Sequence, residues 1–417
     1  MLSVITRGGR GVGDAVRLHW LLALMAWGVP VGLLAPACQP ARSTSANLVV
    51  ATSWSGPSAG ALHRELLGIS RDLGSVNADL RTYSPNAFAD LIARPQPQGW
   101  EGQLDLLIVP NYWLGRLAER GIIGEIPLPR VVALQSRVVG QALLAASRGG
   151  QLLGFPISAS VLALVYDPTR FPAPPATIDD LLAAPLPPDV LPFALDLGDP
   201  YQLAALVACF DGLQPTSDGG LIWRDEATLE VLRRLDRLWS RREAWRACRG
   251  QDLESLQLQL FAEGRLASFV AGPRLIEPLE RLGRPFAVVP LPGFAGAPAP
   301  ATALVSYQCA AVVRQSRWID LGMDVASRLL DDEANDRLNH ATRGLPVLGG
   351  AYQSPEAIAS PATVGFLRAL ENGRPFPASA DWQQTFEAIA VRLARIVTRP
   401  SPPPLDELSA TLMGRAR

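Results

Sequence analysis

Short apolar runs alternate with longer amphipathic segments through the first third of the chain, a pattern that predicts strands alternating with helices. Leucines recur at helical spacing after Pro57, and Asn86 is placed to cap a helix that ends near Ala93. Such alternation indicates a parallel sheet covered on both faces, and therefore an α/β fold. Three runs have the length and composition of strands: Leu48–Thr52, Ala78–Tyr83 and Leu104–Val109.

Ligands of open parallel sheets bind beyond the carboxyl ends of the strands. Those ends are expected at residues 53–57, 84–86 and 110–113. Trp54 and Trp113 lie in these loops, which makes them candidate binding residues.

Two long β-rich runs are expected to join two bodies of the chain. The first follows a polar elbow at Ile157–Ser160 and spans Val161–Tyr166, where Asp167-Pro168 ends it. The second spans Ala303–Val313 and is expected to return between the bodies.

The remaining pattern predicts a mixture of short strands and amphipathic helices. The expected strands are Leu191–Leu195, Leu266–Val270 and Phe286–Val289. The expected helices are Thr177–Ala184, Pro200–Phe210, Asp225–Trp239, Gln251–Glu263, Arg274–Leu282, Trp318–Leu330, Glu333–Thr342, Pro355–Glu371, Trp382–Val397 and Leu405–Met413.

The N-terminus has the layout of an export signal, because three arginines precede an apolar, uncharged run from Leu18 to Ala41. Residues 34–38, Leu-Ala-Pro-Ala-Cys, resemble a bacterial lipoprotein box, which predicts a signal peptide at 1–37, a lipid on Cys38 and a tether at 38–46. An uncleaved membrane anchor and plain secretion stay open as alternatives. All three place the body outside the cytoplasm.

Composition excludes several classes of function. The chain has 417 residues, a net charge of −1, no lysine and no basic run, so nothing favours nucleic-acid binding. Only three histidines are present, and no metal-site spacing appears, so we expect no cofactor and no metal. Cys209, Cys248 and Cys309 read as small buried hydrophobes, although a Cys209–Cys248 bridge stays open.

The order of these segments resembles that of the extracellular solute-binding proteins of ABC importers, in the carbohydrate-binding class that includes the maltose-binding protein. The resemblance runs from Leu48 to about Leu412 and is carried by segments that stand in the family's order. They are Leu104–Val109, Leu117–Glu125, Gly154–Ile157 with Leu164–Asp167, Phe261–Arg265 with Gly272-Pro273, and Phe286–Pro292.

This resemblance implies a type II-like periplasmic-binding-protein fold with a ligand cleft between two lobes. It implies a monomer, anchored to a membrane in the periplasm or at the cell surface, that closes on its solute and docks on the importer's membrane subunits. On that basis residues 47–157 and 303–345 form lobe one, and residues 160–300 and 350–417 form lobe two. Hinge residues are expected near Ile157–Ser160 and Leu304–Tyr307.

The resemblance also implies where the solute contacts lie. Asp199 and Tyr201 match a carboxylate and aromatic position of the second lobe, although Asp199-Pro200 equally suits a helix start. Ser160 stands where the maltose binder has a carboxylate, and Trp54, Ser55, Tyr112 and Trp113 where it has charged residues. Arg274 replaces an aromatic platform, and Trp382 and Phe386 cover the last aromatic position.

Two other functions deserve comparison with sugar binding. An exported hydrolase would need paired carboxylates such as Asp179-Asp180 or Asp331-Asp332, but these lie in amphipathic helical stretches, and no G-x-S-x-G or H-E-x-x-H motif is present. The same fold could bind a non-sugar solute, with Arg274 meeting an anionic group. The absence of adjacent tyrosines argues against iron, and the lack of a carboxylate-rich cleft against polyamines.

Overall fold

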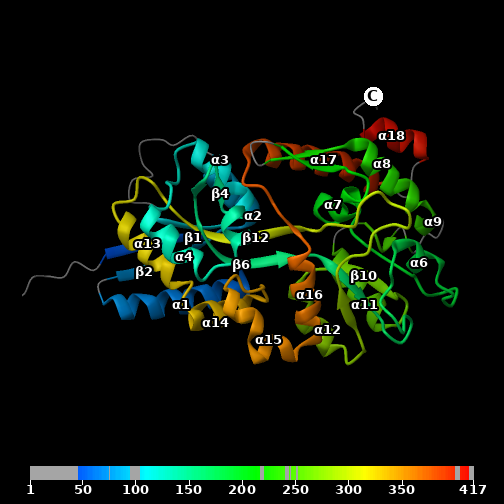
Figure 1. The fold of residues 1–417 in the computed structure, drawn as a ribbon, viewed down its shortest axis with the longest axis horizontal. Coiled ribbons are helices and arrows are strands. Elements are labelled where there is room, and N and C mark those ends of the chain that lie inside the picture. Colours follow the sequence, from blue (N-terminus) through cyan, green and yellow to red (C-terminus); the bar gives the residue numbers. More distant parts are fainter. Residues whose placement is uncertain are drawn as a thin grey trace, which may run out of the picture. The chain divides into compact units, whose positions relative to one another are not determined.

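The central sheet forms from the apolar runs near the N-terminus together with the two long β-rich runs (Figure 1). In the computed structural model its order is β13, β12, β3, β1, β2. β13 and β3 pair with successive parts of one edge of β12, and β6 pairs with the opposite edge. Its strands are β1 (Ala46–Thr52), β2 (Val76–Thr82), β3 (Leu106–Pro110), β6 (Phe155–Val161), β12 (Leu304–Val312) and β13 (Arg374–Pro375).

The structure describes residues 46–74, 76–93, 104–216, 220–239, 244, 246–249, 252–399 and 404–412. Residues 45–417 form a compact unit. The predicted signal peptide and Cys38 lie outside the described residues. Among the described helices, none is long and apolar enough to cross a membrane.

The expected parallel sheet is only partly right. β1 is parallel to both β2 and β3, but β12 runs antiparallel to β3 and to β6. The difference arises because β12 is the return strand of a chain that has already left this sheet through β6.

A second, smaller sheet continues from the first. β6 is followed after the single residue Leu162 by β7 (Ala163–Tyr166), which pairs antiparallel with β10 (Ser268–Ala271) and β11 (Ala287–Val289). The polar elbow predicted at Ile157–Ser160 is therefore wrong, since these residues belong to β6. Ser158, Ala159 and Ser160 are the register partners of Gln308, Tyr307 and Ser306 in β12, and the register shifts by one residue at Ile157, so the serines continue the strand.

Two further short hairpins lie outside the main sheets: β4 (Ser147–Arg148) with β5 (Gln151–Leu152), and β8 (Leu213–Pro215) with β9 (Leu221–Trp223). The strand predicted at Leu191–Leu195 is wrong. Only isolated bridges form there, from Leu191 to Leu266 and from Ala194 to Phe269. The residues that form backbone–backbone hydrogen bonds with this neighbour are Leu191 and Ala194, and a step of three breaks the alternation that a continuous ladder needs.

Helices cover the sheets, and most lie where the hydrophobic pattern predicts them. The first group is α1 (Gly56–Leu73), α2 (Pro85–Ala93), α3 (Leu114–Glu119), α4 (Leu128–Gln135), α5 (Gly140–Ala145), α6 (Ile178–Ala183), α7 (Pro200–Ala208), α8 (Asp225–Arg234) and α9 (Asp236–Trp239). The second is α11 (Leu253–Ala262), α12 (Ile276–Arg281), α13 (Ile319–Arg328), α14 (Asp332–Thr342), α15 (Pro355–Ala359), α16 (Pro361–Glu371), α17 (Ala380–Val397) and α18 (Leu405–Leu412). Short 3₁₀ turns are η1 (Asn111–Trp113), η2 (Pro273–Leu275) and η3 (Gly349–Gln353).

Capping residues correct two helix boundaries. Asn86 does not cap α2; the hydroxyl of Ser84 accepts the hydrogen bond from the Ala87 N–H at 3.2 Å instead. The long helix predicted over residues 355–371 is two helices, because Ser360 caps α16 by accepting from the Thr363 N–H at 3.3 Å.

α1 and α14 pack together on the six-stranded sheet (Figure 1). Arg337 of α14 joins them through a two-point ion pair with Glu65 of α1, with both N–O distances at 3.0 Å. α16 approaches the smaller sheet closely, because a Cβ at Gly365 would lie 2.2 Å from the carbonyl oxygen of Val288 in β11.

That contact predicts opposite effects for two helix glycines. Gly365→Ala should lower the free energy of unfolding by about 2 kcal/mol or more, since α16 must move away from β11. Gly68→Ala is the matched control: nothing lies within 4 Å of its added Cβ, so helix propensity should raise stability by about 0.5–1 kcal/mol. Urea unfolding measures both, and an equal effect of the two changes would contradict the packing described here.

Candidate functional site

A cavity of about 480 Å³ lies where the two sheets meet. Residues that follow or belong to the six-stranded sheet line one side, including Trp54 after β1 and Ser306 in β12. The other side is lined from α7, α11 and the turn after β10, including Asp199, Gln257 and Arg274.

The floor of the cavity is a cross-strand ladder of polar side chains. Ser160 of β6 is the register partner of Ser306 in β12, and Ser158 is the partner of Gln308. All four line the cavity, as does Ala159 between the two serines of β6, whereas Ile157 and Tyr307 are fully buried. Along β12 the period of two therefore turns Ser306 and Gln308 toward the cavity and Tyr307 away from it.

Five of the ten binding residues predicted from the sequence line this cavity: Trp54, Ser160, Asp199, Tyr201 and Arg274. The other five do not: Ser55, Tyr112, Trp113, Trp382 and Phe386. Ser55 is exposed at the N-terminus of α1, and Trp113 packs against Phe88 with ring centroids 5.8 Å apart.

Asp199 combines both roles that its sequence position suggests. Its Oδ1 accepts a hydrogen bond from the Tyr201 N–H at 2.8 Å, so it caps α7, with Pro200 in the first turn. Its side chain also lines the cavity. Burial raises the pKa of this carboxyl to about 6, against the lowering effects of the Tyr201 N–H and of Arg274.

Tyr201 links α7 to the six-stranded sheet. Its hydroxyl donates to the backbone carbonyl of Ser160 at 3.2 Å, and its ring stands 6.0 Å from that of Phe376. Burial raises the pKa of the Tyr201 hydroxyl, so it stays a neutral donor at physiological pH.

An aromatic cluster centred on Phe376 stands behind Tyr201. Three predicted binding residues surround Phe376, with centroid distances of 4.7 Å for Tyr112, 5.8 Å for Trp382 and 5.0 Å for Phe386. Trp382 is only 1 % exposed. Trp382 and Phe386 pack as core behind the cavity wall because α17 turns its apolar face inward, and Tyr112 of η1 packs on the same ring of Phe376.

Tyr112 belongs to this cluster but remains electrostatically coupled to the cavity. Burial, followed by the nearby charge of Asp199, raises its pKa to about 12. The neighbouring Asn111 is fully buried, and its amide donates to the Phe376 carbonyl at 2.5 Å and accepts from the Tyr307 N–H at 3.0 Å. Asn111 thereby ties the cluster to β12.

Several cavity residues were not singled out from the sequence, although a signal for some of them was present. Ser306 and Gln308 interrupt the apolar run of β12 at a spacing of two, which is typical of a strand with one polar face. Gln257 and Glu254 carry no such signal, because polar residues on α11 are ordinary. The missed polar residues are Ser58, Ser158, Asp196, Gln202, Glu254, Gln257, Ser306, Gln308, Thr342 and Arg343.

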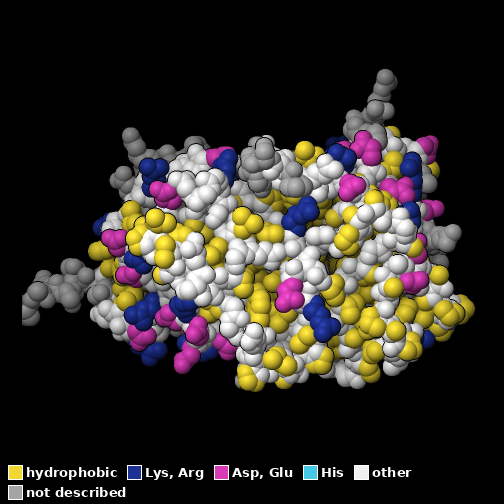
Figure 2. All heavy atoms as spheres, viewed as in Figure 1, with side chains coloured by type: hydrophobic (Ala, Val, Ile, Leu, Met, Phe, Trp, Pro, Cys, Tyr) yellow, Lys and Arg dark blue, Asp and Glu magenta, His cyan; other side chains and the backbone are white. Residues whose placement is uncertain are grey.

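Charged groups at the rim of the cavity form two ion pairs. Arg274 Nε donates to Glu254 Oε2 at 2.9 Å. Arg343, which follows α14, donates from Nε and Nη2 to Glu277 of α12 at 3.0 and 2.7 Å. Elsewhere, charges of both signs are interspersed over the face drawn in Figure 2.

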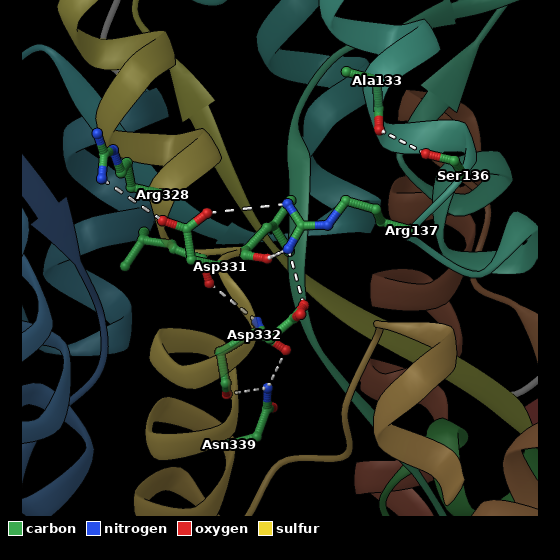
Figure 3. A network of polar contacts seen from close by, with 10 residues as sticks. Ala133, Ser136, Arg137, Arg328, Asp331, Asp332 and Asn339 are labelled. Carbon is green, nitrogen blue, oxygen red and sulfur yellow. Dashed lines mark hydrogen bonds and ion pairs between the residues drawn. The ribbon is translucent and has the colours of Figure 1, made fainter. Parts of the chain in front are cut away.

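The paired carboxylates that suggested a hydrolase have structural partners. Arg137 pairs with both Asp331 and Asp332, at 4.0 and 2.9 Å, and Arg328 also reaches Asp331 (Figure 3). Asp180 completes a capping box with Thr177, and Asp179 accepts from the Ala295 N–H at 2.7 Å. None of these four carboxylates lines the cavity.

The three cysteines of the described body are free and buried. The Cys209–Cys248 bridge left open by the sequence is therefore not formed. Burial raises the pKa of the Cys248 thiol to about 12, which leaves it protonated and unreactive at neutral pH. Within the described residues, no group of three or more His, Cys, Asp or Glu side chains is arranged to hold a metal ion.

The raised pKa of Asp199 predicts that removing its charge stabilises the protein at high pH. Because this pKa is higher in the folded state, the free energy of unfolding falls as the pH rises from about 4 through about 6. Asp199→Asn keeps a good helix cap, so it should be more stable than the wild type by about 1–2 kcal/mol at pH 8. At pH 4 the difference should vanish.

Thermal unfolding at the two pH values measures this difference, with Asp189→Asn on an exposed loop as the control. A gain of the same size at pH 4 and pH 8 would show that Asp199 is not destabilised by its charge.

Comparison with known proteins agrees with this geometry. Residues 82–364, well over half of the chain, match the family model described as bacterial extracellular solute-binding protein. Members of such a family bind solutes and are not catalysts.

Solved structures show the same fold at low sequence identity. The maltose-maltodextrin binding protein of Alicyclobacillus acidocaldarius has a TM-score of 0.72 at 18 % identity, covering 88 % of this chain and 99 % of that one. The Thermus thermophilus maltotriose binding protein gives 0.69 at 20 %, covering 88 % and 99 %. A cyclo/maltodextrin-binding protein complexed with maltotetraose gives 0.69 at 17 %, covering 88 % and 97 %.

These matches confirm the expected α/β fold of the type II periplasmic-binding-protein kind. The resemblance noted in the sequence is confirmed with it: the chain belongs to the bacterial extracellular solute-binding proteins.

Proposed function

We propose that this protein captures a mono- or oligosaccharide outside the cytoplasm and delivers it to an ABC importer. The observation that carries the proposal is the composition of the cavity, where Trp54 and Tyr201 meet Asp199 and the Ser/Gln ladder of β6 and β12. Sugars present apolar ring faces and a rim of hydroxyls, which aromatic faces and planar or hydroxyl hydrogen-bonding groups complement.

The size of the cavity supports a small oligosaccharide. Its volume of about 480 Å³ lies within the range of roughly 300–1,000 Å³ that is common for small-molecule sites. The similar structures described above are those of maltodextrin binders, which supports a sugar rather than naming one.

Delivery to the importer would proceed by closure of two lobes around the solute. The division into residues 47–157 with 303–345 and residues 160–300 with 350–417 remains a prediction. β6 and β12 connect the two sheets, so small backbone rotations near Ile157–Ser160 and Leu304–Tyr307 would change the width of the cavity. The closed monomer would be the form that docks on the importer's membrane subunits.

A thermal-shift screen tests the sugar proposal with two matched tryptophan variants. We expect at least one of glucose, galactose, maltose and maltotriose to stabilise the protein, by about 2.7 kcal/mol at 100 times its dissociation constant. Trp54→Ala should abolish that shift, because it removes the aromatic face in the cavity. Trp113→Ala, which lies outside the cavity, should lower the melting temperature but keep the sugar-induced shift.

No shift with any sugar, or equal loss in both variants, would contradict the proposed function.

We also propose that Cys38 carries the lipid that anchors the protein, on the strength of the residues preceding it. Expressed in a bacterium, the wild type should yield a membrane-extracted chain whose first residue is an acylated Cys38. Cys38→Ala should retain the full leader.

Mass spectrometry of both chains separates the alternatives. A wild type that keeps residues 1–37 would indicate an uncleaved anchor. A Cys38→Ala chain that is still cleaved and released would indicate plain secretion.

A further inference from the structure

Some charged side chains of the cavity have an oppositely charged partner within the protein, and others do not. Arg274 and Arg343 line the cavity, and each already has a carboxylate partner within the protein. Arg274 contacts Glu254 Oε2 through both Nε and Nη2, and Arg343 contacts Glu277 Oε2 in the same way. Neither guanidinium therefore offers an uncompensated positive charge to a solute.

Asp196 and Asp199 are in the opposite situation. Asp199 Oδ1 accepts from the Tyr201 N–H, and Asp196 Oδ1 accepts from the Gly198 N–H, each at 2.8 Å. Neither carboxylate forms an ion pair with any residue that the structure describes. Both line the cavity, so the balance of uncompensated charge at its wall is negative.

Glu254 offsets the positive charge of Arg274 and so leaves the cavity wall with an excess of negative charge. It projects from the first turn of α11 toward η2, where it occupies Arg274, and it is itself a cavity residue. An anionic solute that approached Arg274 would either displace Glu254 or bind beside its carboxylate, so it would lose an existing ion pair or meet a second negative charge. It would also lie near Asp199, on which Arg274 acts electrostatically.

We infer that Glu254 is a specificity-determining residue that excludes anionic sugars, so that the cavity selects neutral and amino-substituted sugars. This inference rests on the proposed function, since it concerns which sugars the same cavity accepts. It also favours one of the two ligand classes left open by Arg274 in the sequence, because the Glu254 carboxylate already offsets the positive charge that would attract an anion. Selectivity of this kind works by adding a repulsive element against the wrong solute.

The test compares matched sugars that differ in charge. Isothermal titration calorimetry at pH 8 would use glucose, glucosamine and glucuronate, their galactose counterparts, and maltotriose beside its aldonic acid. We expect the wild type to bind each acid at least tenfold more weakly than the neutral sugar of its set, and to bind the amino sugars at least as tightly as the neutral ones.

Two glutamine variants separate Glu254 from a general charge effect. Glu254→Gln frees Arg274 and should reduce the preference against acids to about threefold or less, by strengthening acid binding. Glu263→Gln is the matched control, because Glu263 pairs with Arg265 at 3.2 Å just beyond the same helix but does not line the cavity. It should leave every ratio unchanged.

The inference is overturned if the wild type binds the acids as tightly as the neutral sugars, or if Glu254→Gln keeps the wild-type ratio. Amino sugars that bind tenfold more weakly than neutral ones would also overturn it. If no sugar binds, neutral sugars included, the proposed function on which the inference rests is overturned instead.

Discussion

The antiparallel ladder between β6 and β12 is the constraint on which the fold and the cavity both depend. It is where the chain leaves the six-stranded sheet for the smaller one, and where it returns. Ser158 and Ser160 pair with Gln308 and Ser306 through the ladder between the two strands, and the side chains of all four residues line the cavity. A slip of one residue would bury these polar groups and turn Tyr307 outward, so burial of the opposite face fixes the register.

The second wall of the cavity depends on a supported aromatic side chain and a buried charge. Tyr201 is held between the Ser160 carbonyl and the cluster around Phe376, so its ring and hydroxyl have a defined position before any solute arrives. Asp199 is held by the N-terminus of α7 at the expense of stability, as its raised pKa indicates. A carboxylate retained in a site that disfavours its charge is better explained by binding than by folding.

Much of this structure was predictable, because local signals and tertiary packing agree in most segments. The strands β1, β3, β10 and β12 follow from apolar runs, and α7 follows from Asp199-Pro200. The elbow at Ile157–Ser160 was misassigned because its serines resemble a turn, whereas strand pairing with β12 satisfies them. That pairing joins segments about 150 residues apart, which local pattern cannot reveal.

The site was predictable only in part, for a related reason. Trp54 follows from a strand end, which is a local feature, and Asp199 follows from the resemblance to the family's second-lobe carboxylate position. The resemblance predicts Trp382 and Phe386 at the family's last aromatic position, yet α17 packs them against Phe376. Glu254 and Arg343 gave no signal, since only the folded chain brings each to its partner.

The most direct test of the account is a crystal structure of the protein with maltotriose or with whichever screened sugar stabilises it most. The account predicts sugar density in the cavity, with a ring against Trp54, hydroxyls within hydrogen-bond distance of Asp199 and the side chains of the β6–β12 ladder, and Arg274 still paired with Glu254. Sugar bound elsewhere, with the cavity unchanged, would contradict it.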